Sequence, residues 1–279
     1  MYEQVVIDSG ATKSDWRVLD QEGRQIRQSI LPGTNVSAMR LEDVKKVLSE
    51  GLRAESLGKA KGIYLYTAGI VTDEIRRELE ALIRTEAPDA EIDIQNDLMG
   101  AARAVCGHAG GIAAILGTGS NTCFYDGKTL TQKVYSGGFI IGDEGGGACL
   151  GKLFLSDFIK GLVPEPVAGE FAKSYDASYQ AIVHGVYRSD SPSGYLGSIA
   201  PFLLERRDNP YVKSLIESNF RSFINRALLK YDVADYPVGI VGGFGWACMD
   251  ILTPLLEQSG IKVKCFLKDP VEGLCKYHI

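Results

Sequence analysis

The sequence predicts an α/β protein of two lobes, each a mixed β-sheet covered by helices. Its 279 residues exceed the usual length of one domain, so two lobes are the default expectation. A three-stranded pattern occurs twice in the chain, with about a hundred residues between the starts of the two copies. After each copy, helical and strand patterns alternate, as they do in sheets that are covered by helices.

The repeated pattern is a meander of three strands joined by tight turns. Its first copy has strands at 5–7, 16–19 and 24–30, and its second copy has strands at 112–116, 121–125 and 130–135. This repetition indicates a structural duplication, with one meander in each lobe.

Further helices and strands follow each meander. In the first half we expect strands at 62–66 and 91–95 and helices at 41–53, 72–87 (with Thr72 as its N-cap) and 97–105. In the second half, helical segments between 147 and 231 precede a strand at 238–241, a helix at 246–258, a strand at 263–266 and a short helix from Pro270. No low-complexity tract or flexible linker separates the halves.

Composition excludes some classes of function. Hydrophobic residues make up 45% and charged residues 23%, as in ordinary globular proteins, and the net charge of −5 makes nucleic acid an unexpected partner. No apolar run approaches the length of a membrane span, and the start of the chain lacks the regions of a signal peptide, so we expect a soluble cytoplasmic protein with no membrane partner. The six cysteines form no CxxC pair, which favours reduced, mostly buried thiols.

Two glycine-containing turns, one after the first strand of each meander, are suited to phosphate binding. The first contains Gly10, Ala11, Thr12 and Lys13, and the second contains Gly117, Thr118, Gly119 and Ser120. Glycine lets backbone N–H groups approach an anion without a side-chain clash. Asp8, at the end of the first strand, is placed to hold a hydrated Mg²⁺. Either turn alone is an ordinary hairpin turn, but both at equivalent places of a repeat predict a clamp on the triphosphate of ATP.

A third glycine-rich turn, at 242–245, lies between a buried strand and the next helix. It has room for a flat ring against the backbone, so Gly242 and Gly243 are candidates for binding adenosine; a tight helix–sheet connection is the alternative. Two other glycine patterns fail as nucleotide motifs. Leu153 stands where a P-loop needs Ser or Thr, and Thr122 stands where a dinucleotide fingerprint has its third glycine.

A kinase that acts on a hydroxyl needs a carboxylate to accept the proton, and Asp97 is the first candidate. It lies at a strand-to-helix junction, where an Asp would also serve as an N-cap without any catalytic role. Asp143 and Glu144 are further acidic candidates, because the glycines around them predict a loop. These two residues would equally suit the cap of the helix that follows.

In their order along the chain, these motifs resemble those of the BadF/BcrA-type branch of the actin-like ATPases, and within it the N-acetylglucosamine kinases. The resemblance covers most of the chain. The matching segments are 8–14 and 117–121 for the phosphate motifs, 242–244 for the adenosine motif, 31–35 and 67–69 for two sugar-contacting turns, 96–97 for the catalytic base, and 137–145 for an aromatic and acidic sugar-binding stretch. Ala11 stands where many members have glycine, and Phe139 where tryptophan is common.

The resemblance implies two ribonuclease H-like lobes with a cleft between them. The first would comprise residues 1–107, with 268–279 packing back on it, and the second 108–267 with a helical insertion. ATP and Mg²⁺ would serve the reaction, and Asp97 would accept the proton of an amino-sugar hydroxyl, that at position 6. The sugar would be held by Asn35, Thr67, Ala68, Gly138, Phe139 and Asp143. N-acetylglucosamine is the expected substrate, glucosamine and N-acetylmuramic acid stay open, and related kinases are often homodimers.

Two other functions stay in view. A non-kinase ATPase of the same branch would use the clamp to drive a partner protein, as the iron–sulfur activators of dehydratases do. Against this, Cys106, Cys123 and Cys149 show no evident ligand spacing. A sugar-binding regulator without catalysis is the second alternative, and the presence of both Asp8 and Asp97 argues against it.

Overall fold

A computed structural model describes residues 3–10, 13–36, 39–69 and 72–279. The chain divides into two compact units, the first made of Met1–Ala109, Gly127–Thr129 and Pro270–Ile279 and the second of Gly110–Asp126 and Leu130–Asp269. Each unit is built on a five-stranded sheet with helices. The predicted α/β class with mixed sheets covered by helices is therefore confirmed, whereas the predicted cleft between the lobes stays a prediction.

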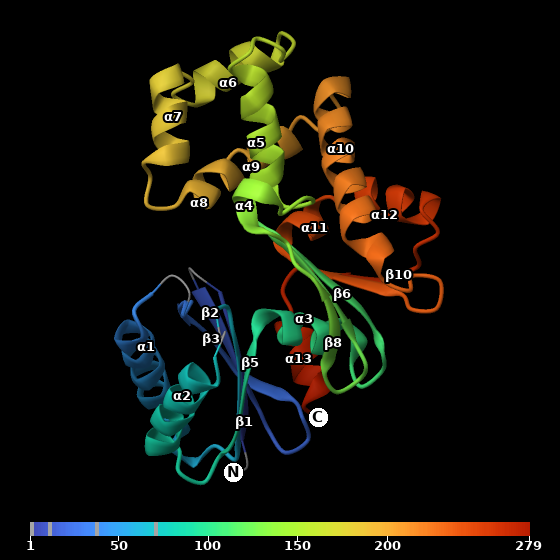
Figure 1. Cartoon of the computed structure of the whole chain (residues 1–279). Coiled ribbons are helices and arrows are strands. Elements are labelled where there is room, and N and C mark those ends of the chain that lie inside the picture. Colours follow the sequence, from blue (N-terminus) through green and yellow to red (C-terminus); the bar gives the residue numbers. More distant parts are fainter. Residues whose placement is uncertain (1–2, 11–12, 37–38, 70–71) are drawn as a thin grey trace. The chain divides into compact units, whose positions relative to one another are not determined.

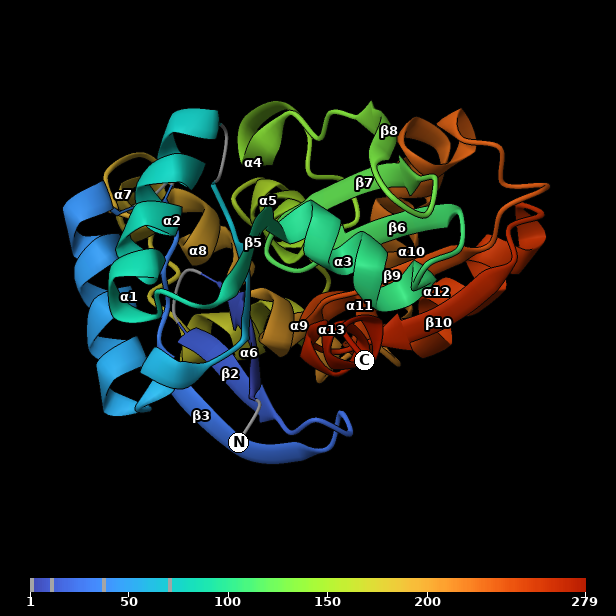
Figure 2. The same ribbon diagram turned by 90° about the horizontal axis from the view of Figure 1, so that it is seen from below.

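The sheet of the first unit has the strand order β3-β2-β1-β4-β5. Its antiparallel meander consists of β1 (Gln4–Ser9), β2 (Lys13–Leu19) and β3 (Gln25–Pro32), and β4 (Gly62–Thr67) and β5 (Glu91–Asn96) continue it in parallel with β1. Its helices are α1 (Leu41–Ala54), α2 (Asp73–Glu86), α3 (Asp97–Cys106) and α13 (Val271–Tyr277), with a short 3₁₀ turn η1 (Leu57–Lys59). Figures 1 and 2 show α1 and α2 on one face of this sheet and α3 and α13 on the other.

The alternation of side chains along β1 explains this sandwich. Val5 and Ile7 belong to the core under α1 and α2, and Val6, which points to the opposite face, packs with residues of α13. Helix α1 buries Val44, Leu48 and its neighbours one helical turn apart, as an amphipathic helix on a sheet does. Both faces of the sheet are thus covered, and its functional groups must lie at the strand ends.

The second sheet has the order β10-β9-β6-β7-β8 and repeats the design. Its strands are β6 (Gly111–Leu116), β7 (Ser120–Tyr125), β8 (Leu130–Val134), β9 (Val238–Val241) and β10 (Val263–Leu267). Its helical elements are α4 (Gly138–Ile141), α5 (Gly147–Phe158), α6 (Val167–Ser174), α7 (Tyr179–Tyr187), α8 (Pro192–Gly197), α9 (Ala200–Leu204), α10 (Pro210–Arg226), η2 (Leu228–Lys230), α11 (Gly243–Ala247) and α12 (Met249–Gln258). Figure 1 shows α5 to α9, in green to yellow, grouped at one end of this unit. One apolar core joins these helices to β6 and β9.

The helix expected at 246–258 is two helices, α11 and α12, and the prediction of one helix is wrong. The chain already turns into helical form at Gly243, and it leaves that form at Cys248, where φ is −109° and ψ is 12°. Cys248 is fully buried at this bend, and its carbonyl accepts hydrogen bonds from Ile251 N and Leu252 N that start α12. Periodicity alone does not show such a bend, because the apolar pattern continues through it.

The six cysteines, all of them among the described residues, form no disulfide, and four of them are buried, as expected. In the part of the chain that the structure describes, no helix is long and apolar enough to cross a membrane. Within the same residues, no group of three or more His, Cys, Asp or Glu side chains is placed to hold a metal ion.

Candidate active site

The carboxyl ends of three parallel strands meet at one edge of the first sheet. The register pairs Ser9 of β1 with Thr67 of β4, and Thr67 with Asn96 of β5. Asp8 precedes this row by one residue, and Asp97 follows it by one. Ligands of open α/β sheets bind at this kind of edge. The fold therefore brings the predicted metal ligand Asp8 and the predicted base Asp97 to the same edge, one strand apart.

The predicted sugar loop is tied to this edge by three buried hydroxyl groups. Thr34 donates hydrogen bonds to Ser9 Oγ from both its N (2.8 Å) and its Oγ1 (2.7 Å). Thr67 donates from Oγ1 to the carbonyl of Thr34, and its side chain is fully buried. The half-buried Asn35 follows directly, and Val36 N bonds to the carbonyl of Ala68 at 3.1 Å.

Thr67 therefore holds the loop in place, because its hydroxyl donates to the carbonyl of Thr34. These hydrogen-bonding roles of Ser9 and Thr34 could not be predicted from the sequence, because small hydroxyl residues in a turn look like ordinary loop residues.

The first phosphate turn is described only in part. Gly10 N donates to Lys13 O at 3.0 Å, which joins the end of β1 to the start of β2, and Lys13 is exposed. Ala11 and Thr12, the other two predicted phosphate contacts, lie outside the described residues.

The N-cap of α3 is Asn96 and not Asp97. The Asn96 side-chain oxygen accepts from Met99 N at 2.8 Å, while Asp97 Oδ1 accepts from Leu98 N at 2.9 Å within the first turn of the helix. The alternative that Asp97 serves as the cap is therefore wrong. Because Asn96 satisfies the end of the helix, a carboxylate at the next position is not needed for capping.

Helix α3 is fixed from its other end by a buried polar network. Arg103 donates from Nη1 to Tyr66 OH (2.8 Å) and to Asp93 Oδ2 (2.5 Å), and Tyr66 OH lies 2.7 Å from Nε2 of His278. Burial raises the pKa of Tyr66 and, together with the nearby Arg103 charge, lowers the pKa of His278 to about 4. The network joins α3, β4, β5 and the residue after α13, so the helix that begins at Asp97 has a fixed position.

The second phosphate turn is held by the start of α5. Gly147 N donates to Gly117 O at 2.9 Å, and Ala148 N donates to Thr118 O at 2.8 Å. A Cβ atom on Gly119 would lie 2.6 Å from Asp143 Oδ2, and one on Gly146 would lie 2.8 Å from Thr118 O. At Gly146 the contact is with backbone, so glycine is required there, and a side chain at position 119 would have to displace the Asp143 carboxylate.

A cavity of about 360 Å³ opens beside this turn. Its lining residues are Gly117, Thr118, Gly147, Gly197, Ala200, Pro201, Leu204, Gly243 and Phe244. The predicted phosphate turn and the predicted adenosine turn thus share one cavity of a size that suits a nucleoside. The wall from α8 and α9 was missed, because nothing in a helical insertion marks which of its residues face a ligand.

Gly242, at the start of the adenosine turn, has a backbone that other residues rarely adopt. Its φ is 122°, and a Cβ atom there would lie 2.4 Å from the carbonyl oxygen of Leu116. The turn therefore approaches β6 closely, and both the conformation and the packing require glycine. This close approach brings Gly243 and Phe244 to the cavity beside Gly117 and Thr118.

Asp143 lies in a tight loop against the second phosphate turn. It is 9% exposed and has a positive φ of 57°. Its Oδ1 accepts a hydrogen bond from Ser120 N at 3.4 Å. Burial raises the pKa of its carboxyl group, opposed by hydrogen bonds from Ser120 and Ser136. Asn219 of α10, 1% exposed, holds this loop through Gly145 N (2.9 Å) and the carbonyl of Gly146 (3.1 Å). Nothing near Asn219 in the sequence indicates this role, because its partners lie more than seventy residues away along the chain.

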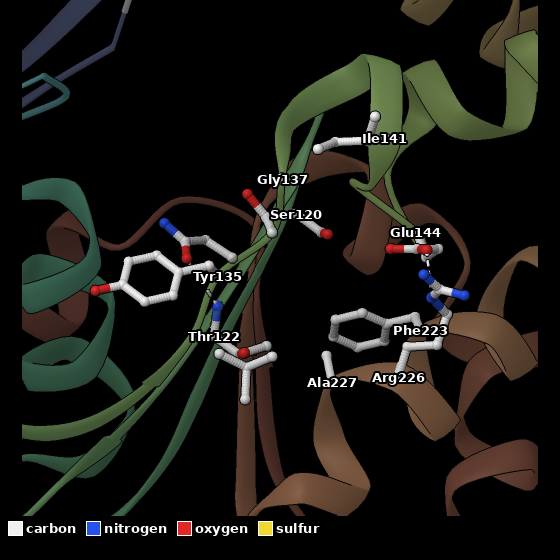
Figure 3. Close-up of a pocket in the computed structure, with 12 residues that line it drawn as sticks. Ser120, Thr122, Tyr135, Gly137, Ile141, Glu144, Phe223, Arg226 and Ala227 are labelled. Atoms are coloured by element: carbon white, nitrogen blue, oxygen red, sulfur yellow. Dashed lines mark hydrogen bonds and ion pairs between the residues drawn. The ribbon is translucent and has the colours of Figure 1, made fainter.

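Neither acidic residue of this loop caps α5, so that alternative is wrong as well. Helix α5 begins after Gly146 with no side-chain cap. Glu144 instead pairs with Arg226, its Oε1 lying 2.6 Å from Nε. Figure 3 shows this pair beside Phe223 at one side of a second hollow, of about 260 Å³, which Ser120 and Gly137 also line. The pair fastens the Asp143 loop to the end of α10.

The predicted sugar contacts at 138–139 are divided by the structure. Gly138 opens α4 with φ of 72°. The side chain of Phe139 lines a separate groove of about 490 Å³, together with residues of α5, α7 and α8, and packs against the second core. Any contact of this segment with a sugar is therefore left to its backbone, and it stays a prediction.

Comparison with known proteins gives a consistent result. No protein-family model matches the chain. A solved structure of a putative N-acetylglucosamine kinase from Porphyromonas gingivalis is 34% identical, covers 99% of this chain and 98% of that one, and superposes with a TM-score of 0.91. A second protein with the same name, from Chromobacterium violaceum, is 20% identical over 99% of both chains, with a TM-score of 0.80 that shows the fold alone.

The N-acetylmuramic acid/N-acetylglucosamine kinase of Clostridium acetobutylicum is 28% identical over 196 residues. The match spans 66% of this chain and 63% of that curated relative. The two five-stranded sheets with helices are those of the actin-like ATPases and sugar kinases. The identity over nearly the whole length of the Porphyromonas protein decides the family: this chain belongs with it among the sugar kinases of the actin-like ATPase fold.

Proposed function

We propose that the protein transfers the γ-phosphoryl group of ATP to a hydroxyl of an amino sugar, the 6-hydroxyl of N-acetylglucosamine. The observation that carries this proposal is the cavity of the second unit, where the turn with Gly117 and Thr118 and the turn with Gly243 meet. Each turn alone is common, but their meeting in one cavity of nucleoside size supports nucleotide binding.

The roles follow from the chemistry of phosphoryl transfer. The neutral turn at Gly117–Ser120 would bind phosphate oxygens, and Lys13 would supply a positive charge. The carboxylate of Asp8 would suit Mg²⁺. This ion commonly binds through one or two carboxylates together with substrate phosphates, so it needs no larger cluster of protein ligands. When bound, the ion would neutralise charge on the phosphates.

The acceptor side relies on the edge of the first sheet and on the Asp143 loop. Asp97, at the first position of α3, would accept the proton of the attacking hydroxyl. Asn35, held on the Ser9–Thr34–Thr67 hydroxyls, and Asp143 would orient the sugar. Positioning and electrostatics supply most of the acceleration in such reactions, which fits residues fixed by buried hydrogen bonds.

The test is ADP release from Mg-ATP with a panel of N-acetylglucosamine, glucosamine, N-acetylmuramic acid, glucose and water. We expect one amino sugar to stimulate release strongly, Asp97→Asn to abolish the stimulation, and the exposed Asp89→Asn, as matched control, to retain it. Near-normal turnover in Asp97→Asn with intact ATP binding would refute the assignment of the base.

The rival is an ATPase that drives a partner protein. It predicts slow hydrolysis that no sugar changes, and brown protein absorbing near 400 nm if a cluster is bound, roughly where thiolate-to-iron charge transfer occurs. The similarity to sugar kinases over nearly the whole chain disfavours this alternative. A homodimer and a cytoplasmic location stay predictions.

A further inference from the structure

We propose that the nucleotide cavity selects its base by shape and not by hydrogen bonds, so that the protein uses GTP and ITP as phosphoryl donors as well as ATP. This proposal rests on the proposed function, because it takes the cavity beside Gly117 and Gly243 to hold the nucleoside. It concerns the choice of donor and is independent of which sugar accepts the phosphoryl group.

The side chains of the cavity carry almost no hydrogen-bonding groups. Gly117 and Thr118 belong to the phosphate turn, and the hydroxyl of the exposed Thr118 is the one side-chain donor or acceptor among the lining residues. The others are glycines or apolar: Gly147, Gly197, Ala200, Pro201, Leu204, Gly243 and Phe244. Every residue of the second unit is described, so no residue of this unit is missing from the description of the lining.

Part of the backbone around the cavity is already committed. Gly147 N bonds to the carbonyl of Gly117 at 2.9 Å, and so it serves the turn and not a ligand. Pro201, on the α9 wall, has no N–H group. Leu203 N, next to the lining residue Leu204, bonds to Ile199 O at 3.3 Å within the helical backbone. These groups offer no donor to the edge of a base.

Base selectivity depends on such groups. Adenine and guanine differ by an amino or an oxo group at C6 and by an amino group at C2. A site that hydrogen-bonds a substrate rejects the analogue that lacks the group by about 10⁴ to 10⁵, whereas an apolar pocket discriminates by only about 10². We therefore expect kcat/KM for GTP and ITP to lie within about a hundred-fold of that for ATP.

Shape gives a second expectation. A pyrimidine ring covers less of the apolar wall formed by Ala200, Pro201 and Leu204, so CTP makes fewer contacts than any purine nucleotide. CTP is accordingly the poorest donor of the four. A cavity that discriminates by size but not by edge groups predicts this order, and a site that hydrogen-bonds adenine predicts a large gap between ATP and all other donors.

The experiment measures sugar phosphate formed from ATP, GTP, ITP and CTP at saturating amino sugar. Displacement of a fluorescent N-methylanthraniloyl-ATP by the same nucleotides measures affinity independently of turnover. We expect the kcat/KM values and the affinities for GTP and ITP to lie within a hundred-fold of those for ATP, and those for CTP to be lower. If the displacement assay gives affinities for GTP and ITP that are more than a hundred-fold lower than the affinity for ATP, the proposal is overturned. If no nucleotide supports transfer to any sugar, the proposed function fails, while the displacement ratios still decide how the base is selected.

A pair of variants tests the apolar wall itself. Leu204→Ala enlarges the cavity. We expect it to lower the affinities for ATP and GTP by the same factor, because both purines lose the same apolar contacts. Leu229→Ala, in η2 and 42% exposed outside this cavity, is the control and leaves both affinities unchanged. A ten-fold change of the ATP-to-GTP ratio in Leu204→Ala would show that this wall distinguishes the bases and would overturn the proposal.

Discussion

Acidification should destabilise the first unit through His278. The ring of His278 stacks on Tyr64 at 3.6 Å, and its Nε2 lies 2.7 Å from Tyr66 OH. Arg103 donates to the oxygen of Tyr66, and the Tyr66 hydroxyl can donate to Nε2 of His278 when that nitrogen carries no proton. Protonation of Nε2 would remove this acceptor and put a second positive charge near Arg103.

The magnitude follows from the two pKa values. Burial first, and then the charge of Arg103, lowers the pKa of His278 from 6.5 to about 4, although Asp93 opposes the shift. The unfolded chain therefore takes up the proton first as the pH falls. Stability is fully present above pH 6.5 and is lost as the pH falls toward 4. The difference between the two pKa values corresponds to about 3 kcal/mol of unfolding free energy, and about 2 kcal/mol of this is lost between pH 7 and pH 5.

The assay uses a tryptophan that reports on this unit alone. Trp16 lies in the core of the first unit and Trp246 in the second, so a Trp246→Phe background leaves one probe. Urea unfolding followed by Trp16 fluorescence at pH 7 and pH 5 is compared with the same series for His278→Gln. We expect the background protein to lose about 2 kcal/mol more than the variant. Parallel losses in the two proteins would refute the burial argument, because carboxylates titrate equally in both.

Three further predictions concern the site. Gly119→Ala pushes the second phosphate turn away from Asp143, and we expect kcat/KM for ATP to fall by about 10²; retained activity would contradict the 2.6 Å approach. Thr67→Val leaves a buried carbonyl of Thr34 without its donor, so KM for the sugar should rise several-fold while KM for ATP stays constant; an equal rise in both would disprove the loop assignment. Asn219→Ala leaves Gly145 N without its acceptor, while the carbonyl of Gly146 keeps its bond from Leu150 N; it should lower the free energy of unfolding by about 1 to 3 kcal/mol in urea titrations, whereas the exposed Asn225→Ala on the same helix should change it little.

Local pattern was sufficient for most of the secondary structure. The strand expected at 238–241 is β9, and the helix expected at 41–53 is α1, which is one residue longer. Thr72 caps α2 as predicted, its side chain accepting from Ile75 N. These elements depend on the period of apolar residues and on a cap within one turn, which are properties of neighbouring residues.

Where two neighbours compete, pattern did not decide. Asn96 and Asp97 are both of residue types that are favoured as N-caps. Which of them caps the start of α3 depends on where β5 ends in its sheet. The bend at Cys248 is similar, because the apolar pattern runs through it and burial of that side chain in the second core sets the break. Both corrections come from packing beyond the local segment.

The sequence by itself determined the two-fold repeated α/β design and the two glycine-containing turns predicted to bind phosphate, since glycine spacing and strand period are local. Only the tertiary structure decided what holds and surrounds these turns. Thr34 bonds Ser9 across 25 residues, Asn219 bonds Gly145 across 74, and His278 reaches Tyr66 across 212. Buried polar groups must find partners wherever the fold puts them. The wall of the cavity beside Gly117 and Gly243, the proposed nucleotide site, is likewise set by how α8 and α9 pack. Such pairings leave no mark on the residues nearby in sequence.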